Sequence, residues 1–241
     1  MHTSLSACGA HRSNGCSDCL PGSLPDVLVT RIAPTPSGYL HPGNAVNFLL
    51  TAWWARQAGG RLLLRIDDMD APRVRRPYLE DVFRVVEWLG IEIDEGPGDV
   101  AEFARSYSMA RRTEYYRTEL DRLDWYACGC SRRELAAGHG GNCLQQQRPL
   151  LPGETAAKVR LPQPCRVDVP GSGTVDVGAA MGDFVVWRRD GLPSYQLASV
   201  VADRDLGVNA LMRGEDLLPS TAAQLFLAPR LGAHVLSLIH I

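Results

Sequence analysis

The stretch Val27–Asn44, VLVTRIAPTPSGYLHPGN, contains the transition that decides the fold. Residues 27–33 form a short run rich in β-branched side chains that ends at a proline, which is typical of a buried strand. Residues 34–43 hold prolines and glycines and indicate a turn. Apolar residues then recur at three- and four-residue spacing over residues 44–58, before a Gly-Gly pair, and this predicts a helix. The stretch is therefore expected to be a strand–turn–helix unit.

The same alternation continues on the C-terminal side of this unit. Residues 61–66 read as a second apolar strand, residues 77–89 as an amphipathic helix and residues 107–123 as a further helix. Strands that alternate with helices pack as parallel strands joined by crossover helices. The sequence therefore predicts an α/β fold with a doubly wound parallel sheet, and residues 26–123 are expected to be the first half of this domain.

The rest of the chain divides into segments of different composition. Residues 124–180 break the alternation with cysteines, glycines and prolines and are expected to be an insertion, whereas residues 181–232 return to apolar segments and are expected to complete the domain. Residues 233–241 are expected to be a truncated or unrelated end. Residues 1–25 are rich in Ser, Gly, Pro and Cys and are expected to be a disordered tail rather than a metal site, despite the ligand-like Cys8, His11, Cys16 and Cys19.

Composition excludes several classes of protein. Lys158 is the single lysine among 25 Lys and Arg residues, and it lies in neither a Gly-Lys-Ser/Thr loop nor a kinase signature, which excludes a P-loop and a protein kinase. The net charge of −2 argues against a protein that coats nucleic acid through bulk charge. No run of about 18 apolar residues predicts a membrane span, and no secretory signal is expected. Seven irregularly spaced cysteines indicate a reducing compartment and possible metal binding rather than a disulfide scaffold, so a cytoplasmic protein is expected. A monomer is expected as well.

The turn before the first helix has the residues of a phosphate site. His41, Gly43 and Asn44 stand where the backbone N–H groups and the dipole of a helix N-terminus favour an anion. A glycine lets a nucleotide approach the backbone, and the two polar side chains can donate hydrogen bonds to phosphoryl oxygens. Such a site would stabilise charge during adenylyl transfer. Taken alone, His-x-Gly is more typical of a proline-capped turn with an incidental histidine than of a phosphate site.

A second candidate site lies in the expected insertion. Cys128 and Cys130 are followed by His139 and Cys143, which together offer three thiolates and one imidazole. These ligands form a complete tetrahedral set for a structural Zn²⁺ ion, which would hold the insertion together without taking part in catalysis. The alternative is three reduced cysteines and an exposed histidine in a glycine-rich loop.

Several colinear segments resemble one known family, the class I aminoacyl-tRNA synthetases of the glutamyl type. The segment from Arg31 to Asn44 is similar to the first class I signature of that family, and Leu64–Asp70, LRIDDMD, is similar to its acidic strand end. Trp88-Leu-Gly and Asp94-Glu-Gly-Pro follow in the expected order, and then come RDGLPSYQLASVVAD at residues 189–203 and RGEDLLPSTAAQ at residues 213–224. The resemblance covers residues 26–232 and implies that residues 26–123 and 181–232 are the two halves of a Rossmann-like, nucleotide-binding catalytic domain.

The resemblance implies a glutamate site. Arg31 would bind the side-chain carboxylate of glutamate with help from Tyr195 and Arg213, because a guanidinium pairs with a carboxylate and rejects the neutral amide of glutamine. Asp67 would hold the α-ammonium group, although the family usually has a glutamate there and the shorter side chain requires a backbone shift or a bridging water. Ala33 and Thr35 would complete the glutamate site.

The resemblance also implies the other substrates. ATP, with Mg²⁺, would be bound by His41, Gly43, Asn44 and Asp216, and the catalytic residues would be His41 and Asn44. The acceptor would be a tRNA. The expected zinc ligands resemble those of glutamyl-queuosine tRNA(Asp) synthetases, a short branch of the family, but full-length glutamyl-tRNA synthetases can also carry zinc here. A group of arginines has two equally good explanations: they contact the phosphates of a tRNA, or they lie on solvated helix faces. The group consists of Arg73, Arg75, Arg76, Arg111, Arg112, Arg132 and Arg133.

One signature of the family is missing. The second class I motif carries a lysine that stabilises the ATP phosphates, and no lysine follows Lys158. We therefore expect the chain to be the N-terminal part of a longer protein and, by itself, to activate glutamate poorly. Two other functions stay open at this point: a small-molecule nucleotidylyltransferase, which shares His-x-Gly, and a non-catalytic RNA-binding fragment.

Overall fold

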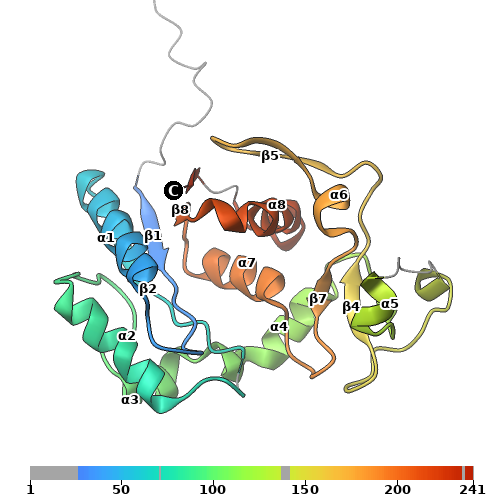
Figure 1. Ribbon diagram of the computed structural model, residues 1–241, viewed down its shortest axis with the longest axis horizontal. Helices are drawn as coiled ribbons and strands as arrows, with labels where there is room; N and C mark the ends of the chain where they lie inside the picture. Colours follow the sequence, from blue (N-terminus) through green and yellow to red (C-terminus); the bar gives the residue numbers. More distant parts are fainter. Residues whose placement is uncertain (1–26, 71, 137–141, 235–236, 241) are drawn as a thin grey trace, which may run out of the picture.

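A computed structural model describes residues 27–70, 72–136, 142–234 and 237–240 (Figure 1). Strand β1 (Val29–Ile32) and strand β2 (Arg61–Leu64) pair in parallel, with Val29 opposite Arg61 and Ile32 opposite Leu64. Helix α1 (Pro42–Gln57) connects them. The strand–turn–helix–strand unit predicted from the sequence is confirmed.

Further segments lie beside both strands. On one side of β2, Leu63 forms a parallel bridge with Glu95. On the other side of the pair, strand β8 (Ala210–Arg213) is joined to β1 through the preceding residue, Asn209. The Asn209 backbone N–H donates to the Val29 carbonyl at 3.0 Å, and the Asn209 Oδ1 atom accepts from the Val29 N–H at 2.8 Å. Strand β8 pairs in parallel with strand β9 (Ser237–His240). The segment at Glu95, β2, β1, β8 and β9 thus lie side by side in this order. Continuous parallel pairing, however, joins only β1 with β2 and β8 with β9.

Strand β2 is buried on both faces. Leu62 and Leu64 pack into a cluster with apolar residues of α1 and of helix α2 (Arg76–Trp88), whereas Leu63 packs into the larger cluster with helices α7 (Tyr195–Asp205) and α8 (Leu218–Leu227). Figure 1 shows the strands between these helix pairs. A parallel strand covered on both faces reads as a continuous apolar run, which explains the pattern of this segment.

The region expected to be an insertion contains its own antiparallel sheet. Strands β3 (Trp125–Cys128), β4 (Ala156–Val159) and β7 (Val185–Trp187) are neighbours in that order. Strands β4 and β7 lie on either side of residue 180, the expected end of the insertion, yet they pair directly. A hairpin of β5 (Arg166–Val169) and β6 (Gly173–Asp176) follows β4. These strands are too short for their pattern to reveal them.

The helix predicted over residues 107–123 is wrong in its first part. Residues Phe103–Tyr107 form a π-helical turn, Met109–Arg112 a 3₁₀ turn, and only Thr113–Leu120 is α-helical, as α4. The reason is a tertiary contact: the buried Asp68 carboxylate accepts hydrogen bonds from the Ser108 hydroxyl at 2.5 Å and from the Ala110 N–H at 3.1 Å. These bonds fix the chain where a continuous helix would run.

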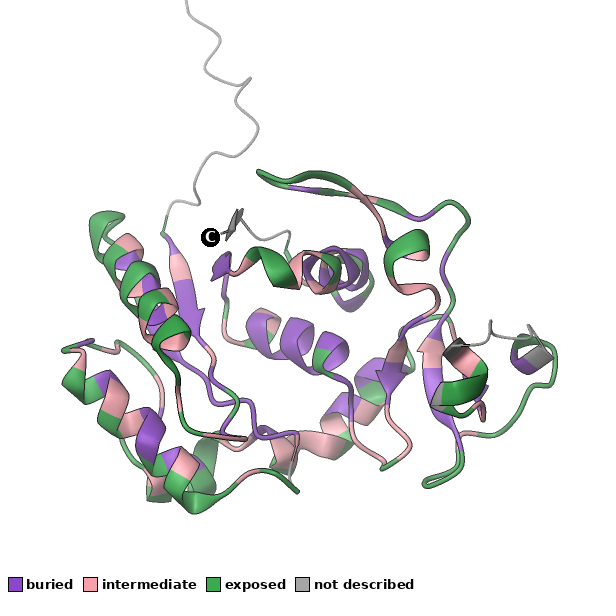
Figure 2. Ribbon diagram, in the orientation of Figure 1, coloured by how far each residue is buried: buried purple, intermediate pink, exposed green. Residues whose placement is uncertain are grey.

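Helix α7 forms the centre of the molecule and is buried from Gln196 to Asp203 (Figure 2). It packs on α4 and α8, and its N-terminal residue is Tyr195. The remaining elements are short: α3 (Val100–Glu102), α5 (Arg132–Ala136), α6 (Val177–Met181) and the 3₁₀ turns η3 (Asn142–Leu144), η4 (Glu215–Leu217) and η5 (Ala228–Leu231).

Two sequence predictions fall on residues that the structure does not describe. The expected tail, with Cys8, His11, Cys16 and Cys19, and the expected zinc ligand His139 both lie outside the described ranges. Within those ranges, no helix is long and apolar enough to cross a bilayer.

Candidate active site

The turn before α1 is closed by reciprocal hydrogen bonds. The Nδ1 atom of His41 accepts from the Gly43 N–H at 3.1 Å, and the Oδ1 atom of Asn44 accepts from the His41 N–H at 3.0 Å. His41 is thus the N-cap of α1, and Pro42 occupies the first helical turn, where its missing N–H is not needed. Because Nδ1 is an acceptor, the neutral imidazole carries its proton on Nε2, which is free to donate to a ligand.

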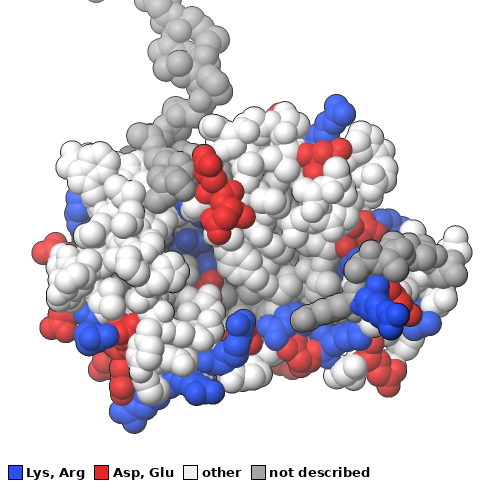
Figure 3. Space-filling model, viewed as in Figure 1, with Lys and Arg blue, Asp and Glu red and all other residues white. Residues whose placement is uncertain are grey.

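A cavity of about 900 Å³ opens in front of this turn. It is lined by all the predicted glutamate and ATP residues except Asp67: Arg31, Ala33, Thr35, His41, Gly43, Asn44, Tyr195, Arg213 and Asp216. These residues come from three stretches of the chain that are distant in sequence: β1 with the following turn and the start of α1, the start of α7, and the end of β8 with η4. In Figure 3, basic atoms lie within the hollow between α1 and α8.

Buried charges form a network behind the cavity wall. Arg31 donates to both carboxylate oxygens of Asp203, at 3.1 and 3.3 Å, and Arg65 donates to Asp203 Oδ1 at 2.5 Å. Arg65 also donates to both oxygens of Asp67, at 2.7 and 3.0 Å. Burial alone would raise the pKa of Asp203, but the guanidiniums of Arg31 and Arg65 hold it below its usual value. Asp67 therefore lies in this network, where Arg65 binds both of its oxygens.

Arg213 is a buried cation with an unused donor. Its side chain is nearly enclosed, its NH1 atom donates to the Thr221 hydroxyl at 3.4 Å, and its NH2 atom has no hydrogen-bond partner among the described residues. Burial lowers the pKa of its guanidinium. An unsatisfied buried donor is costly unless a ligand satisfies it, and a carboxylate is the natural partner of a guanidinium. Arg31 and the half-exposed Tyr195 line the same cavity.

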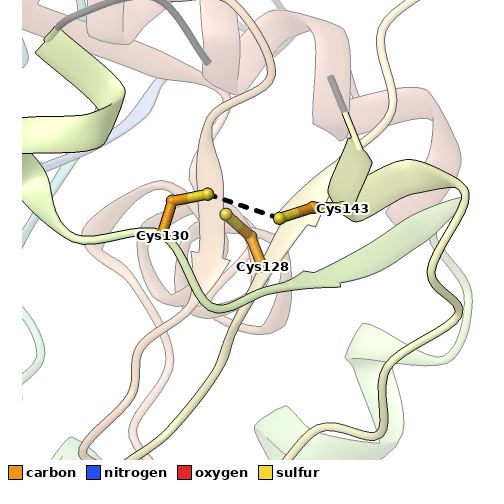
Figure 4. A group of neighbouring side chains, drawn as sticks. All are labelled: Cys128, Cys130 and Cys143. Carbon is orange, nitrogen blue, oxygen red and sulfur yellow. Dashed lines mark hydrogen bonds between the residues drawn. The ribbon is translucent and has the colours of Figure 1, made fainter. Parts of the chain in front are cut away.

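Three cysteines outside this cavity converge on one point (Figure 4). Cys128 ends β3, Cys130 lies in the following loop and Cys143 belongs to η3; their sulfur atoms all lie within 4.8 Å of one another. The Cys130 and Cys143 sulfurs are 3.4 Å apart and share a hydrogen bond, which raises the pKa of Cys130 to about 12. Burial opposes thiolate formation at Cys143, but the bond from Cys130 lowers its pKa overall.

Comparisons with known proteins identify the family of the chain. The family model of the catalytic domain of class I tRNA synthetases (E and Q) matches residues 27–149 and 153–241. The chain belongs to this family. A glutamyl-Q tRNA(Asp) synthetase from Symbiobacterium thermophilum is 39% identical over 89% of this chain and 74% of its own length. A glutamate–tRNA ligase from Desulfosudis oleivorans is 33% identical over 89% of this chain and 48% of its own length.

A solved structure shows the same fold. The crystal structure of glutamate-tRNA synthetase from Elizabethkingia anophelis superposes with a TM-score of 0.72 at 21% identity, over 90% of this chain and 50% of that chain. The architecture is therefore that of a class I synthetase catalytic domain, with both parallel and antiparallel strands.

Several residues that shape this synthetase site were not among the predicted ones. Arg65 and Asp203 hold the network together, and Asp81 of α2 supports the turn before His41. Each is a charged residue inside a buried segment, and a charge within an otherwise apolar run is the signal that could have revealed Arg65 and Asp203.

The arginines considered for tRNA contact have different surroundings. Arg73, Arg76 and Arg112 form ion pairs with Asp70, Glu80 and Asp205 respectively. Arg75 and Arg133 are exposed. Charged side chains follow the lower edge of the face seen in Figure 3, and acidic groups are interspersed with the basic ones. This edge is not a uniformly basic surface.

Proposed function

We propose that this chain activates glutamate with ATP, forming glutamyl-adenylate and pyrophosphate, and that the glutamyl group is then transferred to a tRNA. The observation that carries the proposal is the unpartnered NH2 atom of Arg213, in a cavity that Arg31 and the N-terminus of α1 also line. A buried cation at one part of a cavity and a helix N-terminus at another suit a substrate with a carboxylate and a nucleotide with phosphates.

Glutamate would bind through its side-chain carboxylate. Arg213 offers an unsatisfied donor, Arg31 is fixed by Asp203, and Tyr195 adds a hydroxyl at the same cavity. Asp67 does not line the cavity, so it would reach the α-ammonium group through a backbone shift or a bridging water, using the acceptor sites that Arg65 leaves on its two oxygens. Ala33 and Thr35 line the wall between these groups.

ATP would lie against the start of α1. The Nε2–H group of His41 would donate to the phosphates, the positive end of the α1 dipole would attract them, and the absence of a side chain at Gly43 keeps the backbone accessible. Asn44 serves mainly to fix His41, because its Oδ1 is engaged by the His41 N–H. Asp216 lines the same cavity, and the Mg²⁺ ion that accompanies ATP would neutralise charge on the phosphates.

The cysteine cluster fits a structural zinc ion. Zn²⁺ binds thiolates at about 2.3 Å in tetrahedral geometry, which separates the sulfurs by about 3.8 Å. The sulfurs of Cys128, Cys130 and Cys143 lie within 4.8 Å of one another and need only small adjustments. We assign His139 as the fourth ligand on the basis of its place in the sequence. The ion would hold η3 against the end of β3.

The tRNA substrate that we favour is tRNA(Asp) carrying queuosine. The glutamyl-Q tRNA(Asp) synthetases of Symbiobacterium thermophilum and Geobacter sulfurreducens are 39% and 37% identical to the chain, which covers 74% and 71% of their lengths. The glutamate–tRNA ligases of Desulfosudis oleivorans and Acidithiobacillus ferrooxidans are 33% and 35% identical, and the chain covers 48% of each. The higher identity favours the first group.

The test is glutamate binding followed by transfer. Calorimetric titration of the chain should give one glutamate site per molecule, abolished by Arg213→Met, with weaker binding of glutamine.

Radiolabelled glutamate, ATP and tRNA are then incubated with the chain extended by the C-terminal segment of a relative. We expect label on queuosine-containing tRNA(Asp), and none on tRNA(Asp) lacking queuosine. Label on tRNA(Glu) alone would assign the chain to the glutamate–tRNA ligases, and failure to bind glutamate would reject the proposal.

A further inference from the structure

We infer that Asp203 is a positioning residue that fixes the guanidiniums of Arg31 and Arg65 and, through Arg65, the carboxylate of Asp67. The inference rests on the proposed function, because it explains how groups expected to bind glutamate are held in place. Asp203 does not line the cavity and is almost completely enclosed, so it acts through its neighbours rather than on a substrate.

Asp203 joins three separate elements. It lies near the end of α7, Arg31 lies on β1, and Arg65 directly follows β2. Its Oδ1 accepts from Arg31 Nε at 3.1 Å and from Arg65 NH1 at 2.5 Å, and its Oδ2 accepts from Arg31 NH2 at 3.3 Å. The paired bonds to Arg31 fix the plane of that guanidinium, which a single bond would leave free to rotate.

Arg65 extends this restraint to Asp67. Its NH1 atom is shared between Asp203 and the Ser199 carbonyl at 3.3 Å, and its NH2 atom donates to the Ser199 hydroxyl at 2.8 Å. Its Nε and NH2 atoms bind the two oxygens of Asp67. The position of Asp67 thus depends on a guanidinium that is itself held by α7.

The balance of charge gives Asp203 a second effect. The buried groups Arg31, Arg65 and Arg213 are faced by the carboxylates of Asp67 and Asp203, and within the described part of the chain Arg213 NH2 is a fully buried nitrogen without a hydrogen-bond partner. The two carboxylates leave an excess of one positive charge, which suits one substrate carboxylate. Replacing Asp203 with a neutral residue would leave Arg31 and Arg65 competing for the remaining partners.

Asp203→Asn is the direct test, because asparagine has nearly the same shape but one of its two acceptors becomes a donor. In the wild-type chain, the Nε–H proton of Arg31 should give a nuclear magnetic resonance signal that is protected from solvent exchange. We expect Asp203→Asn to abolish that protection and to shift the Arg65 Nε–H signal, whereas Asp67→Asn should shift only the Arg65 signal. Asp205→Asn, on the same helix but paired with Arg112 and Arg204, is the matched control and should leave both signals unchanged.

Glutamate binding supplies the second measurement. We expect Asp203→Asn to weaken glutamate binding about tenfold or more, while ATP binding stays within about twofold; a merely structural residue would affect both ligands alike. If Asp203→Asn fails to fold, acidification of the wild-type chain decides instead: the Arg31 Nε–H signal must change together with the Asp203 carboxyl signal.

The outcomes separate the two proposals. Two results for the Arg31 Nε–H signal overturn the positioning role, whether or not glutamate binds. In the first, the signal stays protected in Asp203→Asn. In the second, the signal of the wild-type chain does not change together with the Asp203 carboxyl signal on acidification. The positioning role is also overturned if Asp203→Asn abolishes the protection of the Arg31 Nε–H proton but leaves the affinity for glutamate unchanged. If the wild-type chain binds no glutamate but the Arg31 and Arg65 signals respond as expected, the contacts of Asp203 stand and the proposed function is rejected.

Discussion

The carboxylate of Asp81 accepts a hydrogen bond from the backbone N–H of Leu40 at 2.9 Å. Asp81 lies on the buried face of α2, and Leu40 directly precedes His41, the N-cap of α1. Arg84, one helical turn further along α2, forms an ion pair with the same carboxylate. The position of the His41 turn is therefore set by a helix 41 residues further along the chain, as well as by its own capping bonds.

Replacing Asp81 with alanine should disturb this turn. The Leu40 N–H would lose its acceptor, and loss of a partly buried hydrogen bond to a charged group costs about 1.5–3 kcal/mol of the free energy of unfolding. We also expect weaker ATP binding, because His41 would no longer be held at the mouth of the cavity. Urea denaturation and calorimetric titration with ATP measure the two effects.

Glu80→Ala is the matched control for Asp81→Ala. Glu80 is the preceding residue of α2, and its ion pair with Arg76 is largely exposed to solvent. We expect Glu80→Ala to change the free energy of unfolding by less than about 1 kcal/mol and to leave ATP binding unchanged. Equal effects of the two substitutions would show that the bond from Leu40 to Asp81 has no special role.

The two roles of His41 can be separated by substitution. Asparagine is as good an N-cap as any residue, so His41→Asn should keep the free energy of unfolding within about 0.5 kcal/mol of the wild-type value. It removes the imidazole Nε2–H, however, and should weaken ATP binding. His41→Ala should weaken ATP binding and also lower the free energy of unfolding by about 1 kcal/mol. Normal ATP binding by His41→Asn would contradict a phosphate-binding role.

Much of the first half of the domain could be predicted from the sequence. The apolar run from Arg61 to Ile66 and the spacing within α1 follow directly from the burial that each element experiences. Local patterns also placed His41, Gly43 and Asn44 at a helix start, because capping depends on neighbouring residues. These features are determined within short stretches of chain.

Features that depend on distant residues could not be predicted. The π-helical turn before Ser108 results from bonds to Asp68, and the pairing of Arg65 with both Asp67 and Asp203 requires β2 and α7 to meet. The sheet of β3, β4 and β7 could not be predicted because antiparallel pairing of strands of three or four residues has no strong local signal.

Removal of one thiol should release the proposed zinc ion. Cys130→Ser replaces a soft thiolate with a hydroxyl, which is a much poorer zinc ligand, and leaves Cys128 and Cys143 too few to form a closed site. We expect elemental analysis to find about one zinc ion per wild-type chain and well under half of that in the variant. We also expect a chelator to lower the melting temperature of the wild-type chain only.

Cys165→Ala is the control for this measurement. Cys165 is also buried, but it belongs to the main apolar core and not to the group of three converging sulfurs. The variant should keep its zinc even if it is less stable. Zinc loss from Cys165→Ala, or the absence of zinc from the purified wild-type chain, would argue against a zinc site at Cys128, Cys130 and Cys143.

The acid sensitivity of the fold should depend in part on Glu119. This residue of α4 is buried, and its carboxylate accepts hydrogen bonds from Arg204 at 2.8 and 3.0 Å and from Arg122 at 3.0 Å. Burial opposes ionisation, but Arg204 and Arg122 together lower the pKa of Glu119 below its usual value. A carboxyl group whose pKa is lowered by folding contributes stability above its unfolded-state pKa of about 4.3, and this contribution is lost as the pH falls through the lower, folded-state value.

Glu119→Gln should therefore be less stable than the wild-type chain by about 1.5–3 kcal/mol at pH 7, and the difference should shrink once the pH falls below about 4. Urea denaturation at a series of pH values between about 7 and 3 measures it. Glu114→Gln, an exposed position on the same helix, should run parallel to the wild-type chain throughout. A Glu119→Gln difference that stays constant across the whole range would mean that the carboxylate of Glu119 titrates alike in the folded and unfolded chains, and that its bonds to Arg204 and Arg122 add no net stability.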